Sequence, residues 1–412
     1  MPNRLQVWLE GVHVADIERR RRSDTRLYLR YTAEALERWP LNTPLISCSL
    51  PLNTRPAPAN PFLRGLLPEG DALAVMAAEA GTSVADTFGL FERYGRDVAG
   101  ALVISEEPPD ESRFALEPYD HESLVEEVGA LDQHPLGTHD DSELSLAGLQ
   151  NKLLLVKTDQ GWSRPRHGYP STHILKAEDR RYPGMAEGEC NCLILAREVG
   201  LTPVPTESLV LGGIPCLITQ RYDRVTTGRG IQRIHQEDLC QAVGIDGSGN
   251  RGRAKYQRRG GGGPGFRQAA ELLDAHAQDS ETELGRLVAA LIFTIAVGNA
   301  DAHAKNISFL HDTPATIRLA PQYDVTPTLL WPNLTDESAL SVNGRFSLQR
   351  LTITDVIAEA ASWPYKRQEA ERVATETLEQ LLAALSIVHS DELARLIKAR
   401  SEALLAGKPA GG

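Results

Sequence analysis

The sequence predicts an α+β fold in which a strand-rich first half is followed by a mainly helical second half. Near the start, LQVWLEG and LYLRY alternate apolar and polar residues, as half-buried strands do. Apolar stretches of strand length recur between residues 152 and 222. Beyond them the pattern is mainly helical, and the longest apolar run covers residues 287–297.

The composition is ordinary for a globular protein, and 412 residues suffice for two or three domains. The longest apolar run is too short to span a bilayer, and the start, MPNRLQVWLEG, lacks the pattern of a secretory signal. Five scattered cysteines favour free thiols in a reducing cytoplasm, so we expect a cytoplasmic protein with no membrane contact. The net charge of −12 argues against unaided coating of nucleic acid.

The first hundred residues are expected to combine strands and helices. LISCSLPL (45–52) is a candidate for a third strand after the two above. NPFLRGLLPEG and the stretch 71–94 are expected to be helical, and VAGALVI to return to a strand.

The acidic, proline-containing segment 106–113 marks a boundary. We therefore place an α+β subdomain at residues 1–106 and a connecting segment at 107–142. A strand-rich part follows at 143–222, and the helical part comprises 223–412.

The strand-rich part begins with a turn of small residues, SLAGLQNK. A helix at about 186–199 is expected to end at Gly200. The expected strands around it are KLLLVK (152–157), THILK (172–176), ESLVL (207–211) and IPCLITQRY (214–222).

In the second half, the apolar helix is expected to be buried and to end at Gly298. Short strands are expected at NISFL and TIRLA. The segment 247–266 is rich in glycine and arginine and is expected to be flexible.

GNADAHAKN (298–306) places an acid, a histidine, a lysine and an amide directly after the buried helix, which would hold them rigidly. Asp301 and Asn306 are five residues apart, the spacing found in protein-kinase catalytic loops. There the acid accepts the hydroxyl proton and the amide holds magnesium. Asp324, in APQYDVTP, is a candidate for the second metal-binding carboxylate.

Phosphoryl transfer also requires a cation at the nucleotide phosphates. Lys176 ends the strand THILK, and Glu189 on the next helix is placed to pair with it, as in kinases. Taken alone, Lys176 could be a surface lysine and Asp301 a helix-end residue. The ordered set of lysine, glutamate, Asp–Asn pair and aspartate predicts a two-lobed protein-kinase-like fold.

The motifs that carry this order also resemble those of a known family. They are SLAGLQNK, THILK, EGECNCLILAREVGL, QRYDR, IHQEDLCQAVG, GGPG, GNADAHAKN and PQYDV. Together they resemble the HipA family of bacterial serine/threonine kinases, the toxins of toxin–antitoxin pairs. LISCSLPL, FLRGLLPEG and FERYGRDVAGAL extend the resemblance over nearly the whole chain. DAHAKNI is also similar to the D-x-H-x-x-N-I motif of phosphoinositide kinases, to which this fold is related.

The resemblance implies a role for each matching residue. Asp301 would be the general base, and Asn306 and Asp324 would hold Mg²⁺. Lys176, paired with Glu189, would contact the ATP phosphates.

Further ATP contacts are implied for three groups. The phosphate-binding turn would consist of Ala147, Gly148, Leu149, Gln150, Asn151 and Lys152. Main-chain contacts to adenine, in the segment between the lobes, would come from Gln220, Arg221 and Tyr222. Beside the phosphates and the nucleotide would lie His303, Lys305 and Tyr323.

Ser145 matches the serine that kinases of this family phosphorylate on themselves, which silences them. A phosphate at the mouth of the turn would repel ATP, since it adds a charge of about −1.5 to −2. Without the resemblance, Ser145 would be a turn or capping serine.

The resemblance further implies a helix-turn-helix antitoxin dimer as partner, with DNA reached through that complex. The protein substrate would be an aminoacyl-tRNA synthetase, whose inactivation arrests translation and induces dormancy.

Other functions remain open at this stage. One alternative is an inactive co-repressor that only binds the antitoxin on operator DNA, and another is a small-molecule or lipid kinase.

A hydrolase is not expected, because GTSVA (81–85) lacks the final glycine of a hydrolase nucleophile elbow. Gln220 departs from the acidic residue frequent in the family, and Leu149 and Asn151 alter the turn.

Overall fold

The structure is a computed structural model. It describes residues 4–21, 23–131, 134, 152–228, 230–248, 252–257, 262–313 and 315–412. Within these ranges no helix combines the length and the apolar character that crossing a membrane requires.

The N-terminal unit is built on a five-stranded antiparallel sheet in the order β4-β3-β2-β1-β5. Its strands are β1 (Arg4–Leu9), β2 (Val12–Glu18), β3 (Tyr28–Tyr31), β4 (Ala57–Pro58) and β5 (Leu102–Ser105). The alternation that predicted β1 buries Leu5, Val7 and Leu9 on one face. The helices of this unit are α1 (Ala33–Arg38), α2 (Asn60–Gly65), α3 (Gly70–Glu79) and α4 (Thr87–Tyr94).

The prediction of a strand at LISCSLPL is wrong. The segment holds only an isolated bridge between Ser47 and Leu50. Its polar groups have a different partner, because the Glu237 carboxylate accepts hydrogen bonds from Ser47 Oγ at 2.5 Å and from the Cys48 amide at 2.9 Å. A buried loop satisfied in this way has the same apolar pattern as a buried strand.

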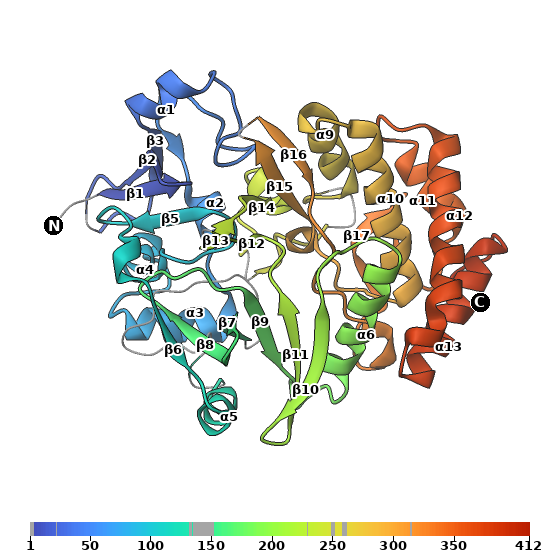
Figure 1. Ribbon diagram of the computed structural model, residues 1–412. Helices are drawn as coiled ribbons and strands as arrows, with labels where there is room; N and C mark the ends of the chain where they lie inside the picture. Colours follow the sequence, from blue (N-terminus) through green and yellow to red (C-terminus); the bar gives the residue numbers. More distant parts are fainter. Residues whose placement is uncertain are drawn as a thin grey trace.

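A six-stranded antiparallel sheet follows, in the order β10-β11-β9-β7-β8-β6. Its strands are β6 (Ala115–Pro118), β7 (Lys152–Thr158), β8 (Gly161–Arg166), β9 (His173–Ala177), β10 (Thr206–Leu211) and β11 (Ile214–Gln220). Helix α6 (Met185–Glu198) packs on β10 and β11, while α5 (His121–Gly129) contacts β10 (Figure 1). The four strands predicted here and the helix before Gly200 are confirmed.

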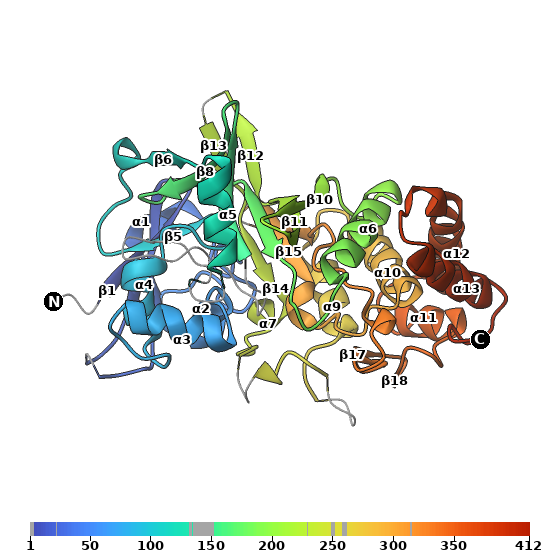
Figure 2. The ribbon, with the colours of Figure 1, turned by 90° about the horizontal axis from the view of Figure 1, so that it is seen from below.

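The C-terminal lobe is mainly helical, as predicted. Its helices are α7 (Leu239–Ala242), α9 (Phe266–His276), α10 (Ser280–Val297), α11 (Ile353–Ala360), α12 (Arg367–Ala384) and α13 (Asp391–Leu405). Figure 2 shows α11, α12 and α13 at the opposite end of the molecule from the N-terminal sheet, while α7 lies near the middle. The lobe also contains short strands, of which only β15 (Ser308–Thr313) and β16 (Thr316–Leu319) were predicted. The others are β12 (Arg224–Thr227), β13 (Gly230–Arg233), β14 (Gln236–Asp238), β17 (Glu337–Val342) and β18 (Arg345–Ser347).

Helix α10 is the buried support predicted for the polar loop. The Asp279 side chain caps its first turn by accepting a hydrogen bond from the Thr282 amide, and most of its residues are buried. The helix ends at Gly298, whose φ of 75° is left-handed. A Cβ at this glycine would lie 3.0 Å from Leu329, so the chain leaves the helix tightly packed.

A buried charge network joins the N-terminal unit to the segment after β11. Asp97 is fully buried and lies 2.8 Å from Arg224 Nη2, and it accepts a hydrogen bond from Ser171 Oγ at 2.7 Å. Asp223 pairs with Arg221 at 2.7 Å. Removing one partner of such a buried pair costs about 3–5 kcal/mol, so this network fixes the N-terminal unit against the strand-rich sheet.

Candidate functional site

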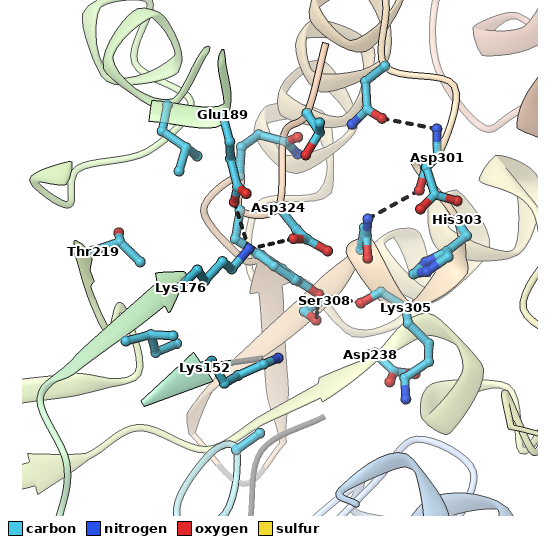
Figure 3. A pocket seen from close by; sticks show the side chains of 18 of the residues that line it. Lys152, Lys176, Glu189, Thr219, Asp238, Asp301, His303, Lys305, Ser308 and Asp324 are labelled. Carbon is cyan, nitrogen blue, oxygen red and sulfur yellow. Dashed lines mark hydrogen bonds and ion pairs between the residues drawn. The ribbon is translucent and has the colours of Figure 1, made fainter. Parts of the chain in front are cut away.

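A cavity of about 530 Å³ lies between the strand-rich sheet, helix α6 and the loop that follows α10 (Figure 3). This volume is in the range of nucleotide-sized ligands. The residues predicted to act together line it from elements far apart in the chain. They are Lys152, Lys176, Glu189, Gln220, Arg221, Tyr222, Asp301, His303, Lys305, Asn306, Tyr323 and Asp324.

Lys176 forms ion pairs with two carboxylates that come from different parts of the chain. It is on β9, and its Nζ lies 2.6 Å from Glu189 Oε1 on α6 and 2.5 Å from Asp324 Oδ1 (Figure 3). Burial alone would lower the pKa of Lys176, but the carboxylates of Asp324 and Glu189 outweigh it and hold this pKa above its ordinary value. The predicted pairing of Lys176 with Glu189 is therefore present, and a second carboxylate shares the same cation.

Lys152 is a second cation on the same sheet. It lies directly opposite Lys176 in the register between β7 and β9. Its side chain is buried, and burial together with the neighbouring Lys176 lowers its pKa to about 8. Two lysines on adjacent strands thus face a cavity in which a polyanion would lower their mutual repulsion.

The loop after α10 presents Asp301 at the cavity wall. The Asp301 amide donates to Asn299 Oδ1 at 3.0 Å, and Asn306 Nδ2 donates to the Asp301 carbonyl at 3.3 Å. Desolvation by the surrounding protein raises the pKa of the Asp301 carboxyl, although a hydrogen bond from the Tyr256 hydroxyl at 2.8 Å opposes that rise. The five-residue spacing therefore corresponds to a closed local turn that fixes the Asp301 backbone.

His303 and Lys305 follow Asp301 in the same loop and line the cavity. Burial lowers the pKa of His303 to about 3, so the imidazole is neutral, and its buried Nδ1 has no hydrogen-bond partner among the described residues. Lys305 Nζ lies 2.8 Å from Glu69 Oε1, and Lys255 Nζ lies 3.0 Å from Glu69 Oε2. Lys305 thus lines the cavity, and a carboxylate from the N-terminal unit holds its ammonium group.

Asp324 and Asn306 both line the cavity. Asp324 has a φ of 56°, which is unusual for a residue other than glycine and is characteristic of functional sites. Desolvation would raise its pKa, but Lys176 outweighs it and keeps the carboxylate ionised.

A carboxylate and an amide oxygen are donors that Mg²⁺ accepts, so the pair fits a magnesium site. In the part of the chain that the structure describes, no three His, Cys, Asp or Glu side chains are grouped to hold a metal by themselves. Phosphate and water oxygens would therefore complete the coordination, as is usual for Mg²⁺ at nucleotides.

The segment after β11 forms the other wall. The amides of Gln220 and Arg221 already donate to the carbonyls of Pro205 and Thr172, at 3.2 and 2.8 Å. The Arg221 guanidinium belongs to the buried network described above. Adenine contacts from this segment would therefore use carbonyl oxygens or the Tyr222 amide.

Two tyrosines pack beside that wall. The rings of Tyr222 and Tyr323 lie 5.5 Å apart, and the Tyr323 hydroxyl donates to the Lys305 carbonyl at 2.5 Å. An apolar ring surface next to a row of main-chain groups suits a planar base.

The phosphate-binding turn cannot be compared with its prediction, because Ser145 and residues 147–151 lie outside the described residues.

Four residues of the site were missed at the level of sequence. Glu69 stands at the N-terminal end of α3, Lys255 belongs to the glycine-rich stretch and Asp238 caps α7, and all three line the cavity. Tyr256, next to Lys255, donates a hydrogen bond to Asp301. Burial raises the pKa of Asp238 to about 6. Within the segment expected to be flexible, residues 255–257 form hydrogen bonds with the Asp301 loop and with residues 339 and 341. For Glu69, Lys255 and Asp238 the charged side chain was the only hint in the sequence of a functional role, because their partners lie far away along the chain.

Comparisons with known proteins show the family and the fold. Residues 5–105 match the model of the HipA N-terminal domain, and residues 144–385 match that of the HipA-like C-terminal domain. A protein of Sinorhizobium fredii named "Putative kinase Y4mE" is 36% identical over 84% of this chain and 82% of its own. The serine/threonine-protein kinase toxin HipA of Shewanella oneidensis is 27% identical over 69% of this chain and 66% of its own.

A solved structure of HipA from Shewanella oneidensis MR-1, in complex with HipB and operator DNA, has a similar fold. It superposes with a TM-score of 0.80 over 98% of this chain and 96% of that chain, at 23% identity. The two chains therefore share the same α+β architecture.

Proposed function

The chain belongs to the HipA family, and on that premise we propose that it is a serine/threonine-protein kinase toxin of a toxin–antitoxin system. It transfers the γ-phosphate of ATP to a serine of a protein. The names of its relatives support the kinase activity, and the cavity supports the chemistry.

One observation carries the proposal. Lys176 lies within 2.6 Å of both Glu189 and Asp324, at a cavity that also contains Asp301 and Asn306. Residues from the strand-rich sheet, helix α6 and the helical lobe converge there in the arrangement that phosphoryl transfer requires.

Each residue then has a role. Lys176 and Lys152 bind the ATP phosphates, and Asp301 orients the acceptor serine and takes its proton as the oxygen attacks the γ-phosphorus. Asn306 and Asp324 would hold Mg²⁺, which when bound neutralises charge on the phosphates.

The remaining contacts are assigned to two groups. Adenine lies against Gln220, Arg221, Tyr222 and Tyr323. Phosphate oxygens are met by Lys305, His303 and the turn 147–152.

The division of the chain at residues 106, 142 and 222 is kept as part of the proposal. The N-terminal unit is joined to the strand-rich part through the Asp97 network, and the two together form one lobe of the proposed kinase.

The partner is a helix-turn-helix antitoxin dimer, through which the protein reaches operator DNA. The similar solved structure contains HipB and operator DNA, which supports this partner. For the protein substrate we propose an aminoacyl-tRNA synthetase.

Phosphorylation of Ser145 by the kinase itself tests the proposed activity. Protein freed of phosphate by a phosphatase is incubated with Mg·ATP, and its intact mass and phosphorylated peptides are measured. We expect a gain of one phosphate on Ser145 and none in the Ser145→Ala variant.

If the unmodified protein binds ATP but gains no phosphate, the kinase assignment is wrong. The chain would then act only by binding the antitoxin on operator DNA.

A further inference from the structure

Residues 255–257 run beside the loop that carries Asp301 and are anchored on both sides of Tyr256. Lys255 is 3% exposed and forms its ion pair with Glu69, while its carbonyl accepts a hydrogen bond from the Ala304 amide at 3.1 Å. One end of the segment is thus tied to the N-terminal unit and to the loop itself.

Gln257 provides the second anchor. Its amide donates to the Ala339 carbonyl at 3.0 Å. Its side-chain Oε1 accepts hydrogen bonds from both the amide and the hydroxyl of Ser341, each at 2.8 Å. Because both neighbours of Tyr256 are anchored, its backbone is held beside the loop that carries Asp301.

Tyr256 contacts the loop at two points. Its hydroxyl donates to Asp301 Oδ1 at 2.8 Å, and its ring lies edge-on against His303, with centroids 5.4 Å apart. His303 is buried, so the ring rests on a rigid surface. The hydrogen bond engages one carboxylate oxygen and leaves Asp301 Oδ2 for the acceptor.

We propose that Tyr256 is a positioning residue that orients the Asp301 carboxylate for phosphoryl transfer. This inference rests on the proposed kinase function and deepens it. In the reaction the acceptor O–H bond breaks and its proton passes to Asp301. The acceptor oxygen bonds to the γ-phosphorus, and the bond from that phosphorus to the bridging oxygen of ADP breaks. An orienting group on a catalytic base is a recurring device, and here a fixed tyrosine supplies it.

The same hydroxyl could instead stand where the acceptor serine must bind, and would then hinder the reaction. The anchors at Lys255 and Gln257 favour positioning, because a group that has to withdraw for every substrate would not be fixed on both sides. The two roles predict opposite effects when the hydroxyl is removed.

The test is the Tyr256→Phe variant, which keeps the ring and removes only the hydroxyl. We expect kcat to fall about 10- to 100-fold, as for loss of one hydrogen bond to a charged group, with KM for ATP unchanged. Tyr365→Phe is the matched control. Tyr365 lies on the helical lobe near Gly285, outside the cavity residues, and its loss should leave kcat unchanged.

A double-variant cycle separates positioning from a structural role. If Tyr256 acts through Asp301, Tyr256→Phe should cause no further loss in an Asp301→Asn background, and the unfolding midpoint should not change. An unchanged or raised kcat in Tyr256→Phe, or losses that multiply in the double variant, would overturn the inference. If the wild type itself transfers no phosphate, the proposed function fails instead, and this inference fails with it.

Discussion

Replacing Asp301 with asparagine should lower the rate of phosphoryl transfer by about 10²- to 10⁴-fold, the usual effect of losing a general base. Asparagine has almost the same shape, so the turn through Asn299 and Asn306 should remain. It cannot take the acceptor proton. Asp301 lies at the cavity wall and is not an ion-pair partner of Lys176, so the affinity for Mg·ATP should change little. Single-turnover rates and calorimetric titration with Mg·ATP measure the two quantities.

Asp274→Asn is the matched control for this experiment. Asp274 is an exposed aspartate on α9, and the same chemical change there should affect neither quantity. An Asp301→Asn enzyme that retained a rate within about threefold of the wild type would exclude Asp301 as the base.

Replacing Lys176 with methionine should impair both catalysis and folding. Loss of a cation aimed at developing phosphate charge typically lowers the rate by about 10²- to 10³-fold. The substitution also leaves Glu189, which is 2% exposed, without its cation and near a second carboxylate. Leaving a buried charge unpaired costs about 3–5 kcal/mol. Measured together, kcat/KM and urea unfolding should therefore both decline.

A second substitution separates the two effects. In Lys176→Met with Glu189→Gln, the buried negative charge is gone, so most of the lost stability should return while kcat/KM stays low. If Lys176→Met alone kept the wild-type kcat/KM, the lysine would have no part in binding the phosphates. If the double variant recovered activity, its role would be structural only.

The parts of the site that the sequence predicted are those defined by local order. Lys176 ends a strand and Glu189 lies on the next helix, so a strand followed by a packed helix brings them together. Asp301 and Asn306 are within one turn of each other, and the buried helix before them was evident from its apolar run. These relations depend on short stretches of chain, which a sequence displays directly.

Glu69, Lys255 and Tyr256 show why the remainder was missed. Glu69 reaches Lys305 across 236 residues, and Tyr256 reaches Asp301 across 45, so no spacing rule connects them. The glycines and arginines around Tyr256 also indicated a flexible segment, whereas tertiary hydrogen bonds fix residues 255–257. The failed strand at LISCSLPL has the same origin, since a distant carboxylate at Glu237 satisfies its backbone.

The central claim is that this cavity transfers the γ-phosphate of ATP to a protein serine. Labelling distinguishes that reaction from transfer of a nucleotide: phosphatase-treated protein is incubated with Mg²⁺ and ATP radiolabelled at either the γ- or the α-phosphate. The account predicts label on serine from γ-labelled ATP only, and its loss in the Asp301→Asn variant. Label from α-labelled ATP, or no label from γ-labelled ATP in protein that binds the nucleotide, would contradict it.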